Sequence, residues 1–469
     1  MSPSLPFLSI QQLSALYRTR EVSPVEVTRQ LLERISALNP QINAFVATTE
    51  NRAQAAAAAS EMRWRQGAPL GPLDGVPITV KDTLMVEGEP FRRGSRATSS
   101  APVAESAPVV DRVLEQGAVL LGITTTPEFG AGPITISPLT GITRNPWDTG
   151  MNSGGSSGGA AASVAAGLCY AGLATDAGGS IRIPANFCGA VGLKATGGRV
   201  PTYPPNVAGA LAVPGAITRD VADAALMLAV LAQPDARDAE LAAPTQDNWL
   251  AAPAGGLKGC RVAVTTDLGY AEQVDPEVAG AVRRAAQVIA GLGAEVVEAD
   301  PGVVDPIETF NTLFRSGFAY ALRSFGPEQL ALVGEQLRDA ARRGAAIDLN
   351  TYLEAQDQRR ALGRAFARFF QDYDLLLTPT TSVTAFAADR WVPESFEDRA
   401  DPRAWTPFGY PVNLAQCPAI TLPCGFSKAG LPIGLQIVGP RFGEATVLAL
   451  AQAYEKARGI EVGAPPQFE

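Results

Sequence analysis

The chain contains no histidine among its 469 residues. This absence excludes a Ser-His-Asp or Cys-His nucleophile, a zinc ion held by histidine, and a histidine that acts as general base near neutral pH. If the protein is an enzyme, its proton transfers must be carried out by lysine, aspartate, glutamate, tyrosine or cysteine.

Cysteine is also scarce, with five residues, an odd number, and no CxxC pair. In a chain of this length that pattern argues against a disulfide framework or a zinc knuckle. The cysteines are therefore interpreted as small buried apolar residues.

Basic residues are outnumbered, with 38 lysines and arginines against 47 acidic residues and a net charge of −9. No sustained Lys/Arg stripe is present, so neither nucleic acid nor an anionic membrane is expected as a partner. The first residues, MSPSLPFLSIQQL, lack a basic region followed by a long apolar stretch, so neither a signal peptide nor an anchor is expected. A cytoplasmic protein is the expectation.

The composition indicates a compact globular protein, because 46% of the residues are hydrophobic and only 18% are charged. The length exceeds that at which single cores usually stop growing, so either two domains or one large α/β sheet is expected. The weakest candidate joints are residues 236–256 and 393–404, although either could be a loop on a single domain.

Local patterns predict an α/β protein. The motif Ser23-Pro24-Val25-Glu26 is a capping box that begins a helix, and alanine-rich residues 50–65 predict a second helix. Beyond residue 75, helical patterns alternate with short apolar runs, which is typical of α/β architecture. The strands expected there cover residues 75–80, 118–124, 170–175, 261–265, 294–298, 373–378, 420–422 and 434–438.

The glycine-rich run at residues 154–159 could cradle a phosphate at a helix N-terminus. However, no Lys-Ser/Thr follows its last glycine, as a P-loop requires, and no GxGxxG opens a helix after a strand. Nucleotide binding is therefore not expected. A small-residue helix packed on a sheet would explain the glycines and alanines but not the adjacent serines Ser156 and Ser157.

Two further residues could carry chemistry. Ser180 follows two glycines at a turn that opens a helix, where small neighbours admit a substrate and free N–H groups can stabilise an oxyanion; the alternative is a structural glycine turn with a serine cap. Lys81 ends an apolar strand and could simply reach the surface. If it is desolvated, its pKa falls and its neutral amine can accept a proton, which makes it the favoured base in this histidine-free chain.

Together these motifs closely resemble the amidase signature hydrolases. The resemblance covers nearly the whole chain, and the separation of Ser156 and Ser180, 180 − 156 = 24 residues, matches the family pattern. The matching segments are GVPITVKD (75–82), TRNPW (143–147), the signature (154–196) and LPIGLQIVGP (431–440).

The resemblance implies a Ser-Ser-Lys triad that needs no cofactor or metal. Ser180 would be the nucleophile, Ser156 would relay its proton, and neutral Lys81 would be the base, with an acyl-enzyme as intermediate. The family's cis peptide maps to Gly155-Ser156. The oxyanion hole would consist of the backbone N–H groups of Ala177, Gly178, Gly179 and Ser180. Supporting rather than reacting residues would be Asp176, Arg182 and Ser157.

The resemblance also implies the architecture: one large domain with a central mixed β-sheet covered by helices on both faces. Residues 1–66 would form an N-terminal helical segment packed on the core. Residues 67–469 would form the core itself, with a variable helical region at about 301–410 that contributes to the substrate pocket.

Specificity is expected to come from loops around the triad. One pocket wall should lie within residues 127–143, which carry a single charge, Glu128, and suggest an apolar acyl or aryl site. The candidate pocket residues on this wall are Phe129, Gly130, Ile134 and Ile136. Candidates for the opposite wall, with core packing as the alternative role, are Phe310, Phe314, Tyr320 and Trp391.

The function expected is hydrolysis of the C–N bond of a small apolar or aryl amide, with carbamate (urethane), anilide and ester substrates also open. A second interpretation is the glutamine-hydrolysing subunit of a tRNA-dependent amidotransferase, and a third is a non-enzymatic binding protein on the same fold. The expected partners are the amide substrate and water, and the protein would be a monomer or a homodimer.

Overall fold

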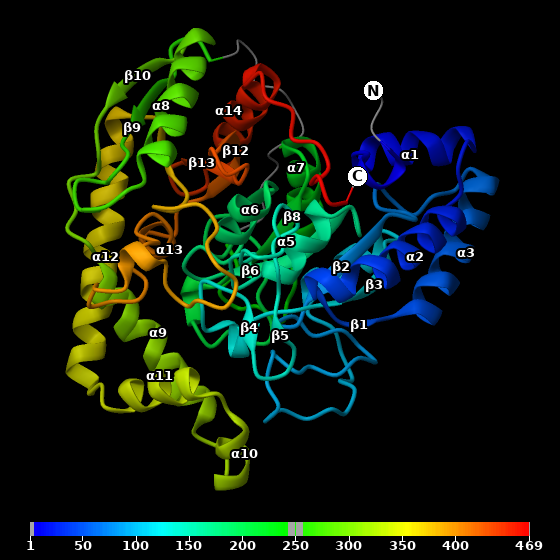
Figure 1. The fold of residues 1–469 in the computed structure, drawn as a ribbon, viewed down its shortest axis with the longest axis horizontal. Helices are drawn as coiled ribbons and strands as arrows, with labels where there is room; N and C mark the ends of the chain where they lie inside the picture. The colour runs from blue at the N-terminus through cyan, green and yellow to red at the C-terminus, as the bar shows by residue number, and fades with distance from the viewer. Residues whose placement is uncertain (1–3, 243–248, 250–256, 469) are drawn as a thin grey trace.

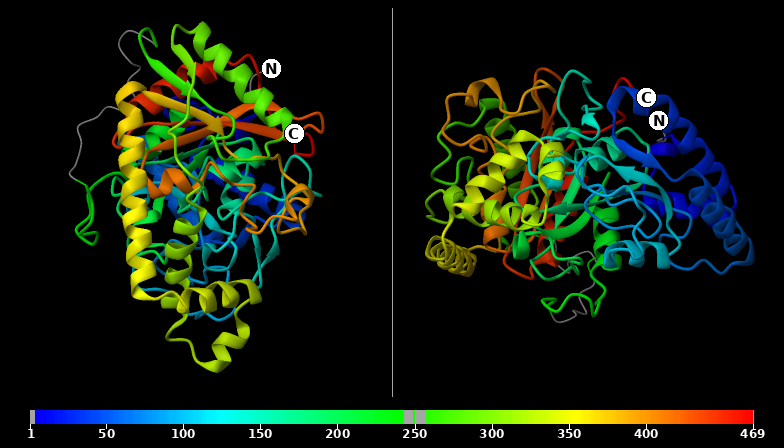
Figure 2. Two further views of the ribbon diagram at one scale, coloured as in Figure 1. Left: turned by 90° about the vertical axis from the view of Figure 1, so that its left-hand side faces the viewer. Right: turned by 90° about the horizontal axis from the view of Figure 1, so that it is seen from below.

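The computed structural model describes residues 4–242, 249 and 257–468. In this part of the chain one 11-stranded sheet runs through the molecule in the order β1-β3-β2-β6-β8-β7-β12-β13-β11-β9-β10 (Figures 1 and 2). Strand β2 pairs in parallel with β3 and β6, whereas β8 pairs antiparallel with β6 and β7. The predicted α/β fold with a mixed sheet is therefore confirmed.

The strands are β1 (Phe45–Thr48), β2 (Pro77–Lys81), β3 (Val119–Thr124), β4 (Ile136–Ser137), β5 (Gly141–Ile142), β6 (Ala171–Asp176), β7 (Val191–Lys194), β8 (Val213–Thr218), β9 (Arg261–Val264), β10 (Glu295–Glu298), β11 (Leu375–Pro379), β12 (Ala419–Phe426) and β13 (Pro432–Val438), of which β4 and β5 form a separate hairpin. The helices are α1 (Ile10–Thr19), α2 (Pro24–Ile42), α3 (Glu50–Gln66), α4 (Pro108–Glu115), α5 (Gly158–Ala165), α6 (Arg182–Cys188), α7 (Val221–Leu231), α8 (Pro276–Gly291), α9 (Ile307–Leu322), α10 (Pro327–Leu332), α11 (Glu335–Ala345), α12 (Leu349–Asp372), α13 (Tyr410–Leu414) and α14 (Glu444–Ala457).

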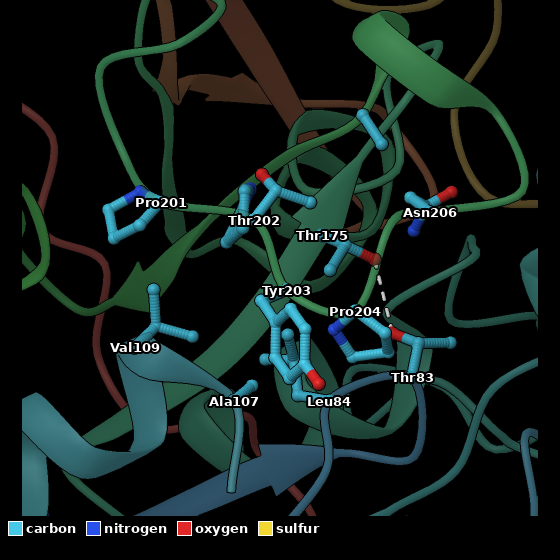
Figure 3. Close-up of a pocket in the computed structure, with 12 residues that line it drawn as sticks. Thr83, Leu84, Ala107, Val109, Thr175, Pro201, Thr202, Tyr203, Pro204 and Asn206 are labelled. Carbon is cyan, nitrogen blue, oxygen red and sulfur yellow. Dashed lines mark hydrogen bonds between the residues drawn. The ribbon is translucent and has the colours of Figure 1, made fainter. Parts of the chain in front are cut away.

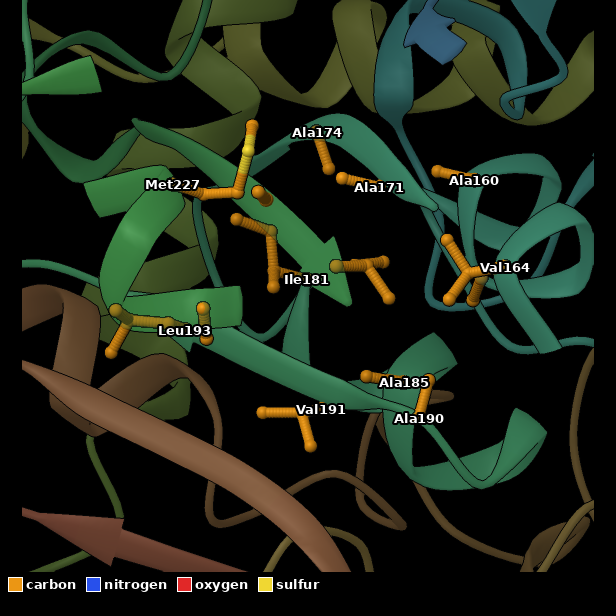
Figure 4. Packing of buried hydrophobic residues seen from close by; sticks show 14 of the residues in the cluster. Ala160, Val164, Ala171, Ala174, Ile181, Ala185, Ala190, Val191, Leu193 and Met227 are labelled. Atoms are coloured by element: carbon orange, nitrogen blue, oxygen red, sulfur yellow. The ribbon is translucent and has the colours of Figure 1, made fainter. Parts of the chain in front are cut away.

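Helices cover both faces of the sheet, as expected. A Cβ added to Gly192 in β7 would meet Ala185 of α6 at 2.8 Å, whereas the next residue, Leu193, lines a small cavity with Leu228 of α7. Because successive strand residues point to opposite faces, α6 and α7 lie on opposite sides of the sheet. Figure 4 shows the small side chains, Ala171 and Ala185 among them, that fill this region.

The glycine and alanine content of the signature segment has a packing reason. A Cβ on Gly172 of β6 would lie 2.9 Å from the Cβ of Ala160 in α5, closer than side chains approach. Larger residues would push α5 away from the sheet, and with it the serine loop that precedes this helix.

The N-terminal segment follows the prediction with one correction. The capping box of α2 is present: the Ser23 Oγ accepts the Glu26 N–H at 3.2 Å and the Glu26 carboxylate accepts the Ser23 N–H at 2.8 Å. Residues 1–66 are not wholly helical, however, because β1 pairs antiparallel with β3 at the end of the sheet. Four residues between two helices are too few for a visible strand pattern. The division of the chain at residue 66 stays a prediction.

Strands β7 and β8 and helix α7 are not apparent from the sequence patterns. Both strands are buried along their whole length and contain glycine or proline, so they show no alternation of polar and apolar residues. The candidate joint at residues 236–256 lies largely outside the described residues. The other candidate, 393–404, is a loop with a 3-10 turn at Glu394–Phe396.

The region at 301–410 contains α9 to α12 (Figure 1). Strand β11 also passes through it and enters the sheet between β9 and β13. This strand was expected from the apolar run at residues 373–378. Among the described residues, no helix combines the length and apolar character needed to cross a bilayer.

Candidate active site

Lys81 ends β2 with its side chain fully buried, at 0% exposure. Its Nζ donates hydrogen bonds to Ser156 Oγ at 2.7 Å, Ser157 Oγ at 2.9 Å and Thr175 Oγ1 at 3.2 Å. Burial lowers the pKa of Lys81 from 10.5 to about 7, although the negative charge of Asp176 opposes this shift. A substantial fraction of the amine is therefore neutral near pH 7 and can accept a proton.

The two serine loops lie next to each other at the ends of parallel strands. Ser156 follows a cis peptide bond after Gly155, and a Cβ on Gly155 would lie 2.6 Å from the backbone of Ile134, so only glycine fits there. The Ser157 N–H donates to the carbonyl of Ser180 at 3.2 Å. Ser180 itself is partly exposed in the loop between β6 and α6. The structure thus brings the predicted lysine and both serines together beyond the carboxyl ends of β2 and β6.

Asp176 organises the loop that carries Ser180. Its carboxylate accepts the N–H groups of Gly179 at 2.7 Å and Ile181 at 3.1 Å, and it forms a fully buried ion pair with Arg182 at 3.0 Å. Burial alone would raise the pKa of Asp176, but the charge and hydrogen bonds of Arg182 hold that pKa well below its usual range. The carboxylate therefore stays ionised and fixes the loop.

Sequence reasoning missed two residues that complete this network. Asn413 accepts a hydrogen bond from Arg182 at 2.6 Å and donates to the Asp176 carboxylate at 3.0 Å, and Gln436 accepts from Arg182 at 2.6 Å. The signal that could have identified Gln436 is an amide within the apolar run of β13, where a buried polar group needs a partner.

The predicted oxyanion donors are not equivalent. The Gly179 N–H is already bound to Asp176, so it is not free to bind an oxyanion in this conformation. Among the described residues, the N–H groups of Ala177, Gly178 and Ser180 have no backbone or side-chain acceptor. In this conformation three of the four predicted donors are therefore free of a described acceptor, and the oxyanion role of the set stays a prediction.

Two threonine hydroxyls extend the hydrogen-bond network of the lysine, and sequence reasoning did not find them. The Thr175 hydroxyl, which accepts from Lys81, lies 3.2 Å from the Thr83 hydroxyl. Figure 3 shows both threonines facing a small cavity beside Tyr203 and Pro204. The cavity measures about 10 Å³, about the space that one water molecule needs.

A larger cavity of about 420 Å³ begins next to the turn that faces Ser156. Gly130 faces Ser156, since a Cβ on Gly130 would lie 3.4 Å from the Ser156 Oγ, and the next residue, Ala131, lines this cavity. Its wall includes the predicted residues Ile136 and Trp391 and further apolar side chains, together with the carboxylates of Glu128 and Glu335. Its volume is within the range of small-molecule sites.

The remaining predicted pocket residues do not line this cavity. Phe129 is buried beneath the guanidinium of Arg93, and Ile134 is fully buried against Gly155. Phe310 packs between Tyr410 and Phe314 within the core, with its ring close to Gly178. Tyr320 is 66% exposed and lines a different cavity, of about 950 Å³, between α9 and α12.

Comparisons with known proteins give matches over nearly the whole chain. The sequence model of the Amidase family matches residues 26–448. The chain is 38% identical to a glutamyl-tRNA(Gln) amidotransferase subunit from Myxococcus xanthus, over 96% of this chain and 97% of that protein. It is 36% identical to an acylamidase of Rhodococcus erythropolis, over 97% and 96%. A bacterial aryl acylamidase superposes with a TM-score of 0.89 at 30% identity, and the match covers 96% of each chain.

The fold, the site and these matches define an amide-bond hydrolase of the α/β class. The chain belongs to the amidase signature family. The expectation that the protein is an enzyme is thereby confirmed, and the interpretation as a non-enzymatic binding protein is set aside.

Proposed function

We propose that this amidase hydrolyses small carboxylic amides with an apolar or aryl group, through an acyl-enzyme on Ser180. The observation that carries the proposal is the contact of a buried Lys81, with a pKa of about 7, with the Ser156 hydroxyl at 2.7 Å. A lysine at its ordinary pKa would be protonated at neutral pH and could not act as the base.

The first half of the reaction forms the acyl-enzyme. The Ser180 Oγ attacks the carbonyl carbon while its proton passes to Ser156, whose own proton passes to Lys81. The N–H groups of Ala177, Gly178 and Ser180 stabilise the negative oxygen of the tetrahedral intermediate. The C–N bond then breaks, and the proton held by Lys81 returns through Ser156 to the leaving nitrogen.

The second half releases the acid. Water attacks the Ser180 ester and gives its proton to Lys81 by way of Ser156. The bond from the acyl carbon to the Ser180 Oγ breaks, and that proton returns to the serine. The net products are one carboxylic acid and one amine, with the enzyme unchanged.

The apolar cavity that begins at Ala131 supports an apolar or aryl group on the substrate. Similarity to an acylamidase and to an aryl acylamidase supports the same class. Anilides are the substrates of choice for a first test, with carbamates and esters as related classes that the same acyl-transfer chemistry serves.

The test uses the purified chain with 4-nitroanilides, matched phenyl carbamates and phenyl esters, and follows release of the amine or phenol. Hydrolysis by the wild type, together with loss of at least about 10³-fold in kcat for Ser180→Ala at unchanged Tm, is expected. Rapid quenching should trap an acyl adduct on Ser180 by mass spectrometry. A Ser180→Ala protein with near-wild-type activity would overturn the proposal.

A second candidate is the glutamine-hydrolysing subunit of a tRNA-dependent amidotransferase, which is favoured by the 38% identity to such a protein. The same protein preparation separates the two functions. Turnover of an anilide without glutamine or added proteins supports a stand-alone amidase, whereas glutamine hydrolysis alone supports the amidotransferase role.

A further inference from the structure

The loop directly after β2 carries an arginine, Arg93, that packs on Phe129 in the turn that faces Ser156. Asp82, the neighbour of Lys81, accepts the N–H groups of Arg92 at 3.0 Å and Gly94 at 2.8 Å. These bonds hold residues 92–94 against the end of β2, so the position of Arg93 between them is fixed relative to the lysine.

Arg93 is joined to the turn that faces Ser156. Its backbone is in the left-handed region, at φ 55°, and its carbonyl accepts the Phe129 N–H at 2.7 Å. Phe129 is also left-handed, at φ 53°, and it precedes Gly130, which faces the Ser156 hydroxyl. Two adjoining non-glycine residues in this sparsely populated region are characteristic of a site whose geometry is held for function.

The charge of Arg93 has no counterpart in the part of the chain that the structure describes. Its guanidinium lies 4.1 Å from the centre of the Phe129 ring, yet it forms no ion pair or hydrogen bond with a described residue. Asp82 is the carboxylate whose charge acts on it, but both Asp82 oxygens are used by backbone N–H groups. Burial lowers the pKa of Arg93 to about 10.

The neighbouring Arg92 differs from Arg93 in its hydrogen bonds. Arg92 donates to the Thr98 hydroxyl at 3.4 Å and to the Ser95 carbonyl at 3.3 Å, so its guanidinium has neutral hydrogen-bond partners within its own loop, whereas that of Arg93 has none among the described residues. Guanidinium groups withdrawn from water normally pair with an anion, because an unpaired desolvated charge costs free energy that a partner recovers. Arg93 as a whole residue keeps partial exposure to solvent, although burial acts on its guanidinium, so a small anion can approach it.

We propose that Arg93 binds a carboxylate of the substrate, and that the preferred substrates are therefore amides carrying a carboxylate in either the acyl or the amine portion. This inference rests on the proposed amide hydrolysis. Arginine suits this role because its planar group can bind a carboxylate through two parallel hydrogen bonds while it remains stacked on an aromatic ring.

The test compares charged and neutral substrates of matched shape. One series pairs the mono-4-nitroanilides of succinic and glutaric acid with 4-nitroanilides of unbranched fatty acids of equal length. The other pairs 4-acetamidobenzoate with 4-acetamidotoluene. The wild type is expected to prefer the carboxylate in at least one series, roughly 10- to 100-fold in kcat/KM, as a hydrogen bond to a charged group typically contributes.

The variants Arg93→Gln and Arg93→Ala should abolish this preference while retaining hydrolysis of the neutral anilides, with the loss mainly in KM. The Arg93→Lys variant should keep part of the preference for the carboxylate substrate, because it keeps the positive charge. The matched control is Arg92→Ala, which removes a neighbouring charge and should change both members of a pair equally.

Three outcomes are decisive. A wild-type preference for the carboxylate that Arg93→Gln removes, in folded protein of unchanged Tm, supports the inference. Turnover of neutral anilides with no preference in either series, or a preference that survives in the folded Arg93→Gln variant, overturns it and leaves the proposed function intact. If the wild type hydrolyses none of the anilides, the proposed function is overturned instead.

Discussion

The Nζ of Lys81 lies 2.7 Å from the Oγ of Ser156, and the lysine side chain is closed off from solvent. Because the chain has no histidine, it has no side chain whose ordinary pKa lies near 7, and the buried lysine is the base that we propose for the two serines. The protonation state of one buried amine should therefore control turnover.

The activity should rise with pH through about 7. Burial places the Lys81 pKa at about 7, and the proposed base is the deprotonated form, so kcat/KM is expected to increase from pH 6 to pH 8 and then level off. The measurement is a pH–rate profile on a neutral anilide. A profile that falls steadily from pH 6 to pH 9 would contradict lysine as the base.

Lys194 provides a matched control for this profile. It is also fully buried, with a pKa lowered to about 8 by burial, but its Nζ donates to the carbonyl of Ala195 rather than to a serine. The Lys194→Met variant should leave unchanged the pH at which kcat/KM rises, that is, the acid limb of the pH–rate profile. If the acid limb moves in this variant, the titration that it reports belongs to Lys194 and not to Lys81.

Thr175→Val should shift the acid limb to lower pH. The Thr175 hydroxyl accepts a hydrogen bond from Lys81 at 3.2 Å and thereby stabilises its charged form. Removing that acceptor favours the neutral amine, so the apparent pKa should fall by roughly half a unit to one unit. Thr83→Val is the control, because Thr83 contacts Thr175 but not the lysine, and it should produce a smaller shift. An apparent pKa that rises in Thr175→Val would contradict this role of the Thr175 hydroxyl.

Gly130→Ala should lower activity beyond its effect on stability. Gly130 has φ 71°, and an added Cβ would lie 3.4 Å from the Ser156 Oγ, the hydroxyl that relays the proton in the proposed reaction. Gly141 has φ 78° with nothing within 4 Å of an added Cβ, so Gly141→Ala carries the same backbone strain without that contact.

Both alanine variants should lose about 1–2 kcal/mol of unfolding free energy in urea titrations. Only Gly130→Ala should also lose roughly 10- to 100-fold in kcat/KM, because small misplacements at the reacting centre are amplified. Equal kinetics in the two variants would show that the turn does not border the substrate.

Asp176→Asn should destabilise the protein by about 3–5 kcal/mol, since it leaves the buried charge of Arg182 without its partner. The partly exposed pair of Arg390 and Glu397 is the control, and Glu397→Gln should cost less than about 1 kcal/mol. Urea titration of the free energy of unfolding measures both, and a loss below about 1 kcal/mol for Asp176→Asn would mean that the ion pair does not hold the loop.

The same ion pair predicts an acid dependence. The folded-state pKa of Asp176 is lowered, so its contribution to stability is complete above the unfolded value of about 4 and is lost as the pH falls toward the folded value. Wild type should therefore lose stability more steeply than Asp176→Asn when the pH falls below about 4. Parallel losses in the two proteins would contradict this dependence.

Local sequence was sufficient to predict much of the site. Lys81 ends an apolar β-branched run, and Ser156 and Ser180 follow glycines before helices. Spacing and backbone preference therefore led us to expect all three beside a sheet, which is where they lie, and their catalytic roles stay predictions. The capping box of α2 was likewise visible, because its two partners are three residues apart.

The partners of Arg182 could not be predicted in this way. Gln436 and Asn413 lie 254 and 231 residues away along the chain, and they reach Arg182 only because β12, β13 and α13 pack beside the signature segment. The Thr175–Thr83 contact and the unpaired guanidinium of Arg93 depend in the same way on which loops the sheet order brings together in the described part of the chain.

The sequence by itself determined which groups are available for chemistry: no histidine, two serines 24 residues apart, and a lysine at a strand end. Only the tertiary structure decided that this lysine is buried rather than exposed, that the Gly179 N–H is already bound, and that a cavity begins next to the turn that faces Ser156. The physical reason is that a side chain's intrinsic chemistry is local, whereas desolvation, charge pairing and open space are properties of all the segments that pack around it.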